Sequence, residues 1–144
     1  MKKTIAFLTV VMAYSISFAH GLTEGSYTGN GLWKSNTAKG NYQASTDIGK
    51  KTIQAKYVLA GGTTLEWNFD ILESANGFFD VISHGKKLGS GYCLDNVPVC
   101  HYEIATGKFK LEETLVQQSN TIYRYGSKDE GRGSITWQES LDME

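Results

Sequence analysis

Apolar and polar residues alternate strictly along residues 65–71, where Leu65, Trp67, Phe69 and Ile71 are separated by polar side chains. Successive side chains of a β-strand point to opposite faces, so this two-residue period predicts a strand with one apolar and one solvated face. The same period recurs between glycine-rich breaks along much of the chain. The pattern therefore predicts a protein built of half-buried strands.

Short turns rich in glycine, asparagine and serine separate the candidate strands, and the longest break is predicted at residues 126–133. The candidate strands are residues 25–35, 42–48, 53–59, 65–71, 78–83, 88–94, 101–105, 108–116, 121–125 and 134–141. Sequential hairpins of this kind are typical of an up-and-down barrel or a two-sheet sandwich. We favour the barrel, because closure leaves no exposed sheet edge. The expected fold is an all-β, antiparallel up-and-down barrel of about eight to ten strands.

One phase of these strands places large apolar side chains on a common inner face. A barrel of about eight strands either fills its centre with side chains or holds one small ligand, and the pattern is compatible with both interiors. If the interior is a cup, the predicted ligand-binding residues are Tyr42, Tyr57, Trp67, Phe69, Phe79 and Trp137.

The N-terminus has the features of a cleavable secretory signal. Lys2 and Lys3 precede an apolar run from Ile5 to Met12, and small residues follow at Ser17 and Ala19. The run is too short to span a bilayer, and no second hydrophobic segment follows it. We expect residues 1–19 to be removed and residues 20–144 to form one domain. The expected location is the periplasm or the medium, as a soluble protein without a membrane span.

The charge of the chain argues against nucleic acid as a partner. The full sequence carries 14 basic and 15 acidic side chains. Loss of Lys2 and Lys3 with the signal makes the mature protein more acidic. Phosphate backbones are recognised by basic surfaces, so nucleic acid is excluded as the main partner.

Cys93 and Cys100 are the only cysteines of the chain. In an oxidising compartment their pairing is the default expectation. The residues between them contain turn formers and the only proline of the chain, Pro98. The pair is therefore predicted to close a short loop between two strands.

The chain shows no local catalytic or metal-binding motif. The hydrolase signature Gly-x-Ser-x-Gly is absent, and Gly89-Ser90-Gly91 lacks its spacing. His84 and His101 are interpreted as surface residues beside a disulfide, so no metal and no cofactor are expected. The protein is therefore predicted not to be an enzyme.

Acidic side chains on the strands are predicted to face solvent. They include the row Glu66, Asn68 and Asp70 and the pair Glu112-Glu113. Likewise, Lys128-Asp129-Glu130 is interpreted as a polar turn.

The first predicted strand carries Gly31-Leu32-Trp33, which resembles the Gly-x-Trp signature of the lipocalin and wider calycin barrels. The resemblance implies a lipocalin-like barrel in which the tryptophan packs against an arginine of a late strand through a cation-to-ring contact. Arg124 is the first choice for that arginine and Arg132 the second. Gly31, Trp33 and Arg124 would then be structural, and the cup would carry a small hydrophobic molecule.

Two functions follow from these observations. The first is an exported, non-enzymatic barrel that holds a small hydrophobic, lipid-like ligand. The alternative is an exported inhibitor or partner-binding protein with a packed core that recognises another protein through its surface loops. The loop from Asp95 to Val99 is the candidate surface for the alternative, because a braced loop loses less entropy when it docks.

Overall fold

The computed structural model of the protein describes residues 21–94 and 96–144. The predicted signal peptide, residues 1–19, lies outside the described residues. Its cleavage and a single domain that begins at residue 20 stay predictions.

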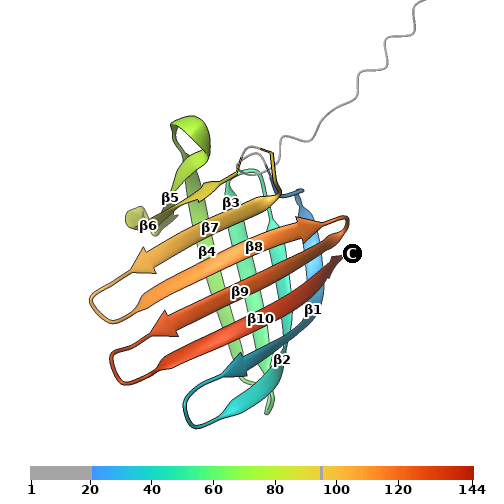
Figure 1. The fold of residues 1–144 in the computed structure, drawn as a ribbon, viewed down its shortest axis with the longest axis vertical. Helices are drawn as coiled ribbons and strands as arrows, with labels where there is room; N and C mark the ends of the chain where they lie inside the picture. Colours follow the sequence, from blue (N-terminus) through green and yellow to red (C-terminus); the bar gives the residue numbers. More distant parts are fainter. Residues whose placement is uncertain (1–20, 95) are drawn as a thin grey trace, which may run out of the picture.

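The described residues form ten antiparallel strands and one short 3-10 helix, η1 (Ala75–Gly77). The chain runs up and down through a closed barrel in the order β1-β10-β9-β8-β7-β6-β5-β4-β3-β2 (Figure 1). The strands are β1 (Gly25–Lys34), β2 (Lys39–Ile48), β3 (Thr52–Leu59), β4 (Thr64–Glu73), β5 (Phe78–Ser83), β6 (Lys86–Cys93), β7 (Val99–Ala105), β8 (Lys110–Gln118), β9 (Thr121–Asp129) and β10 (Ser134–Met143). This confirms the predicted all-β, up-and-down barrel.

Pairing of the first strand with the last closes the barrel. The β1–β10 ladder runs from Tyr27 opposite Met143 to Lys34 opposite Thr136. Each strand therefore has a partner on both sides, so no long edge is left to pair with another chain. This arrangement decides against the two-sheet sandwich.

Strand β9 extends four residues past its predicted end at Tyr125, through Gly126 to Asp129. The prediction treated Gly126 as the start of a long turn, and this was wrong. Gly126 is paired on both sides, with Trp137 of β10 and Glu113 of β8. A glycine inside a ladder marks a close approach, and here the ring of Trp137 occupies the space that a side chain would fill.

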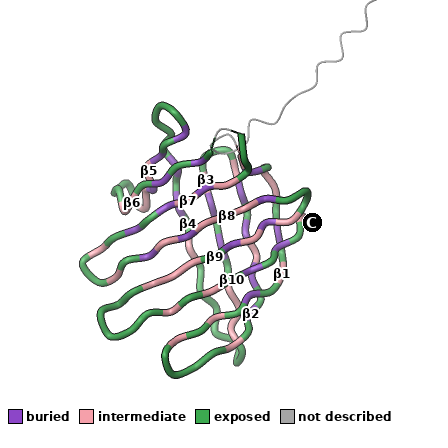
Figure 2. The backbone as a smooth tube through the Cα atoms, in the orientation of Figure 1, coloured by how far each residue is buried: buried purple, intermediate pink, exposed green. Residues whose placement is uncertain are grey.

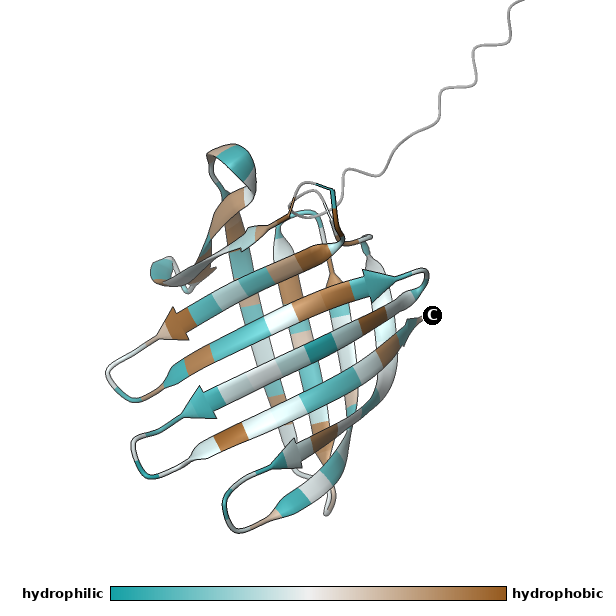
Figure 3. Cartoon of the chain, viewed as in Figure 1, coloured by the Kyte–Doolittle hydropathy of each residue, from teal (hydrophilic) through white to brown (hydrophobic). Residues whose placement is uncertain are grey.

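One half of the barrel interior is packed with apolar side chains. Figure 2 shows the buried residues gathered along the strands and the exposed ones at the hairpins, and Figure 3 shows polar and apolar residues alternating along the strands. Leu22, Tyr27, Leu115, Ile122 and Leu141 are each fully buried. They lie at the end of the barrel where β1 begins and β10 ends. Leu22 precedes β1 and belongs to the same buried cluster. The filled interior that the pattern allowed is therefore present in this half.

The predicted disulfide joins Cys93 at the end of β6 to Cys100 at the start of β7. The two residues are direct partners in the β6–β7 ladder. In the chain-entropy account, a cross-link across so short a loop stabilises the folded state by about 2 to 3 kcal/mol. The barrel itself is closed by the β1–β10 ladder.

Removal of this disulfide should weaken the protein without unfolding it. We expect Cys93→Ala/Cys100→Ala to lower the free energy of unfolding by about 2 to 3 kcal/mol in urea titrations. The far-UV circular dichroism of a β protein should persist, because none of the other strand pairs is touched. The reduced wild-type protein is the control and should show a similar loss. Unfolding of the variant in buffer would contradict this account.

Candidate functional site

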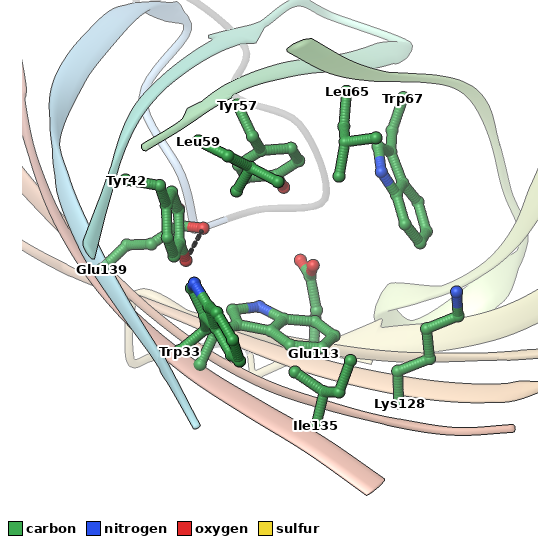
Figure 4. A pocket seen from close by; sticks show the side chains of 11 residues that line it. Trp33, Tyr42, Tyr57, Leu59, Leu65, Trp67, Glu113, Lys128, Ile135 and Glu139 are labelled. Carbon is green, nitrogen blue, oxygen red and sulfur yellow. Dashed lines mark hydrogen bonds between the residues drawn. The ribbon is translucent and has the colours of Figure 1, made fainter. Parts of the chain in front are cut away.

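The other half of the barrel contains a cavity of about 340 Å³ (Figure 4). It lies among the ends of β1, β3 and β9 and the starts of β2, β4, β8 and β10. Its lining is largely aromatic and aliphatic: Trp33, Tyr42, Tyr57, Leu59, Leu65, Trp67, Glu113, Lys128, Ile135, Trp137 and Glu139. All three tryptophans of the chain belong to it. The volume falls at the lower end of the range of small-molecule sites, about 300–1,000 Å³.

Four of the six predicted ligand-binding residues line this cavity: Tyr42, Tyr57, Trp67 and Trp137. The other two, Phe69 and Phe79, are buried in the packed core. Phe69 lies between Trp67 and Tyr102, with ring centroids 5.8 and 6.4 Å away. All six side chains point into the barrel, as predicted. The position of each residue along its strand decides whether its ring lines the cavity or lies in the packed core.

A buried arginine forms the floor between the cavity and the packed core. Arg124 of β9 is 1% exposed. Its Nη1 donates to Glu139 Oε2 at 3.0 Å and to the hydroxyl of Tyr57 at 2.9 Å, and its Nη2 donates to Thr46 Oγ1 at 2.8 Å. Its Nε lies 3.3 Å from Glu113 Oε2. One side chain therefore ties β9 to strands β2, β3, β8 and β10.

Two tyrosines complete the hydrogen bonds of the buried carboxylates. Tyr42 donates its hydroxyl to Glu139 Oε1 at 2.8 Å, and Tyr102 donates to Glu113 Oε2 at 2.6 Å. Burial raises the pKa of both hydroxyls, and the nearby carboxylates raise it further. Both tyrosines therefore stay neutral donors over the whole physiological range.

Two glycines make room for aromatic rings to reach these carboxylates. Gly31 is paired with Tyr42 on one side and Glu139 on the other. Likewise Gly126 is paired with Trp137 and Glu113. A Cβ on Gly31 would lie 2.2 Å from Cζ of Tyr42, and one on Gly126 would lie 2.2 Å from Cε2 of Trp137. In each of these two sets of paired residues, the aromatic side chain lies over the glycine of the middle strand, on the side of the glutamate.

Glu113 is a buried carboxyl group of the site with a raised pKa. It is 3% exposed, and burial raises its pKa above the ordinary value of 4.5. The charge of Arg124 and the donors Tyr102 and Trp137 oppose this shift, while the charge of Glu139 adds to it. Nε of Arg124 and Nε1 of Trp137 are buried without a hydrogen bond of full geometry in the described part of the chain.

The structure corrects the solvent-facing assignment of Glu113. Its neighbour Glu112 does face outward and pairs with Lys110 at 2.9 Å, and Glu66, Asn68 and Asp70 are exposed as expected. Glu113 instead shares the inward phase of Leu111 and Leu115, both fully buried. This phase was the signal in the sequence that could have identified it.

Two further charged residues lie inside the barrel, where the sequence pattern was not expected to place them. Glu139 shares the phase of Trp137 and Leu141, and Lys128 shares that of Arg124. Lys128 was assigned to a polar turn, but it lies on β9 and lines the cavity. Its Nζ bonds to Glu130 and lies 4.7 Å from the centroid of the Phe109 ring.

The resemblance to lipocalins implied structural roles for Gly31, Trp33 and Arg124, and the structure gives these residues different contacts. Arg124 bonds to glutamate, tyrosine and threonine, rather than packing on Trp33. Trp33 lies over Gly40 and lines the cavity, and Gly31 accommodates the ring of Tyr42. Gly31 and Trp33 are therefore next to the cavity, and Arg124 lies below it between the cavity and the packed core.

The disulfide loop lies at the end of the barrel opposite the cavity. Of the predicted docking surface from Asp95 to Val99, the structure describes residues 96–99. Val97 is 49% exposed, and the carbonyl of Pro98 accepts a hydrogen bond from the backbone of Gln117 at 2.9 Å. A role for this loop in binding a partner stays a prediction.

Two other kinds of feature are absent from residues 21–94 and 96–144. Within them, no group of three or more histidine, cysteine, aspartate or glutamate side chains is arranged to hold a metal ion. No helix in this part of the chain is long and apolar enough to cross a membrane.

Comparison with known proteins shows a likeness in fold to a solved structure. The S-type phycobiliprotein lyase CPES from Guillardia theta superposes with a TM-score of 0.65 over 85% of this chain and 88% of that chain, at 7% sequence identity. No protein-family model matches the chain. No curated protein matches it either. The likeness therefore supports the lipocalin-like barrel fold, and no family match supports membership of the lipocalins.

This comparison corrects the prediction of a non-enzymatic protein. That prediction relied on the absence of local motifs, yet a protein named as a lyase has the same fold over most of both chains. Groups that converge inside a barrel come from different strands, so they leave no contiguous motif. Glu113, Arg124 and Glu139, from β8, β9 and β10, show this directly.

Substitution of Gly126 should disturb the cavity. The Cβ of Gly126→Ala would lie 2.2 Å from the Trp137 ring, so the ring must move, at a cost of about 1 to 3 kcal/mol. We expect a lower urea midpoint and a shifted tryptophan emission maximum. Gly107→Ala is the matched control, since its Cβ would meet nothing within 4 Å. Equal stability and emission in the two variants would contradict the role of Gly126.

The buried Glu113 should make stability depend on pH in a defined direction. Its folded pKa is raised, so its contribution to stability is complete below about pH 4.5 and is lost as the pH rises through the folded pKa. Glu113→Gln does not titrate. The free energy of unfolding of this variant, relative to wild type, should therefore increase between pH 4 and pH 8 in urea titrations.

Glu112→Gln is the control for this experiment, because hydrogen bonding to Lys110 lowers the pKa of Glu112. Its relative stability should stay level or fall over the same range. If the Glu113→Gln difference also stays level or falls, Glu113 is not a buried carboxyl of raised pKa.

Proposed function

We propose that this protein binds a small hydrophobic, lipid-like molecule in the open half of its barrel. The observation that carries the proposal is the cavity of about 340 Å³, whose lining combines three tryptophans and two tyrosines with Leu59, Leu65 and Ile135. Water gains few hydrogen bonds from such walls, so an apolar ligand that displaces it is favoured. The likeness in fold to a protein named as a phycobiliprotein lyase supports a barrel of this kind as a scaffold for a small-molecule site.

The rigid floor adds to this proposal. Arg124 and its partners tie five strands together directly below the cavity. A pre-formed pocket loses less conformational entropy on binding than one that must be built around its ligand. The cup therefore retains its shape when it is empty.

We also propose that the protein acts in an exported compartment. The support is the pattern at residues 1–19 and the disulfide between Cys93 and Cys100, which persists in oxidising surroundings. A carrier of apolar molecules fits this setting, because such molecules need a soluble host outside the membrane.

Binding can be tested with N-phenyl-1-naphthylamine, a neutral probe whose fluorescence rises in apolar surroundings. We expect saturable binding at one site per protein. Leu59→Trp adds bulk inside the cavity and should weaken probe binding at least about tenfold, which is about 1.4 kcal/mol.

The matched control is Leu72→Trp, the same substitution at a residue of β4 that is 60% exposed at the packed end. This variant should bind the probe as wild type does. Absence of saturable binding to the wild-type protein, or equal binding to both variants, would refute the proposed cup.

A further inference from the structure

The floor of the cavity holds more negative than positive charge. Glu113 and Glu139 both reach it, and Arg124 is the cation bonded between them. Lys128 also lines the cavity, but its ammonium group is engaged by Glu130 and by the ring of Phe109. Buried charges are stable when they are paired, so one carboxyl of this floor needs a proton or another cation.

Glu113 is the carboxyl with capacity for that cation. Glu139 is engaged at both oxygens, by Tyr42 at Oε1 and by Arg124 at Oε2. Glu113 accepts a hydrogen bond from Tyr102 at Oε2, and Figure 4 shows its carboxyl group pointing into the cavity between the side chains of other strands. A ligand that enters the cavity therefore meets Glu113 at its inner end.

The walls around this carboxyl also suit a cation. Trp33, Trp67, Trp137 and Tyr57 line the same space. The π faces of tryptophan and tyrosine attract ammonium groups, most strongly where water is excluded. An anionic head group would instead lie next to the carboxyl groups of Glu113 and Glu139 in surroundings of low polarity, where it would be repelled by each of them that is ionised.

We propose that the cavity selects apolar molecules that carry a basic nitrogen, with the cationic group placed at Glu113. This proposal rests on the proposed function, because it names the chemical class of the ligand held in the same cup. The apolar part of the ligand would lie along Leu59, Leu65 and Ile135 toward the mouth.

Binding of such a cation should release a proton. In the empty cup burial favours the protonated form of Glu113. The cation replaces that proton, so affinity should increase as the pH rises through the pKa of Glu113. The groups that face Glu113 are Arg124 on β9, Glu139 on β10, Tyr102 on β7 and Tyr57 on β3, with Tyr42 on β2 and Lys128 at the mouth. Of these, the tyrosines and Arg124 have raised pKa values and keep their protons from pH 5 to pH 8.

The test is a matched series of C10 compounds with different head groups. Decylammonium, decan-1-ol and decanoate are titrated against the protein at pH 7.5, by displacement of N-phenyl-1-naphthylamine and by tryptophan emission. We expect decylammonium to bind at least about tenfold more tightly than each of the others. Glu113→Gln should remove this preference, measured as the ratio of the affinities for decylammonium and decan-1-ol. Glu112→Gln makes the same charge change on the outer face and should keep the preference.

Each result leads to a decision. Equal affinity for the three compounds overturns the cation site and leaves the hydrophobic cup standing. Tightest binding of decanoate overturns the cation site and indicates an anionic group bound at Lys128. Tightest binding of decan-1-ol also overturns it and indicates a neutral ligand hydroxyl that accepts a hydrogen bond from Trp137. If none of the compounds binds and the naphthylamine probe also fails, the proposed function itself is refuted.

A pH series with wild-type protein tests the proposal without relying on the folding of Glu113→Gln. Decyltrimethylammonium has a charge that does not change with pH. Its affinity should rise between pH 5 and pH 8, and calorimetry in two buffers of different ionisation enthalpy should show net proton release. Affinity that is independent of pH, with no proton released, would overturn the assignment of Glu113.

Discussion

The contact between Arg124 and its two glutamates is the interaction on which the arrangement of this barrel depends. A guanidinium group that is 1% exposed is tolerated only if hydrogen bonds and opposite charges replace its water. Glu139, Glu113, Tyr57 and Thr46 provide them from four other strands. Burial disfavours the charged guanidinium, yet the surrounding groups hold the pKa of Arg124 well above its usual range. The cation therefore persists and fixes the relative positions of the strands.

This polar layer divides the interior into two regions with different properties. The inward positions of β9 run from Ile122 in the packed core, through Arg124 and Gly126, to Lys128 at the mouth. On one side of the layer aliphatic and aromatic side chains fill the barrel, and on the other side aromatic rings line a cavity. The size and polarity of the cavity are thus decided by a few residues at one depth of the barrel.

Glycine has an unusual part in forming the cavity. Gly31 and Gly126 each lie between an aromatic residue and a glutamate in neighbouring strands. Without a Cβ, each allows a ring to lie against the backbone; the hydroxyl of Tyr42 then donates to Glu139, whereas Nε1 of Trp137 is buried without a hydrogen-bond partner among the described residues. Two rows of the same construction surround Arg124, one with tyrosine and one with tryptophan. The likeness to the phycobiliprotein lyase concerns the fold, so the chemistry of the cup is specific to these side chains.

The sequence by itself determined the class of fold, because strand alternation and turn residues are local properties. It predicted all ten strands, the disulfide and the aromatic inner face. Only the tertiary structure decided which inward residues surround a cavity and where the charges go. Glu113 had the phase of a core residue but the chemistry of a surface one, and its place depends on Arg124, Tyr102 and Trp137 in other strands. Similarly, a glycine that follows an apolar run, as Gly126 does, usually indicates a turn. Here the ring of Trp137 lies across the ladder against Gly126, which is part of a strand.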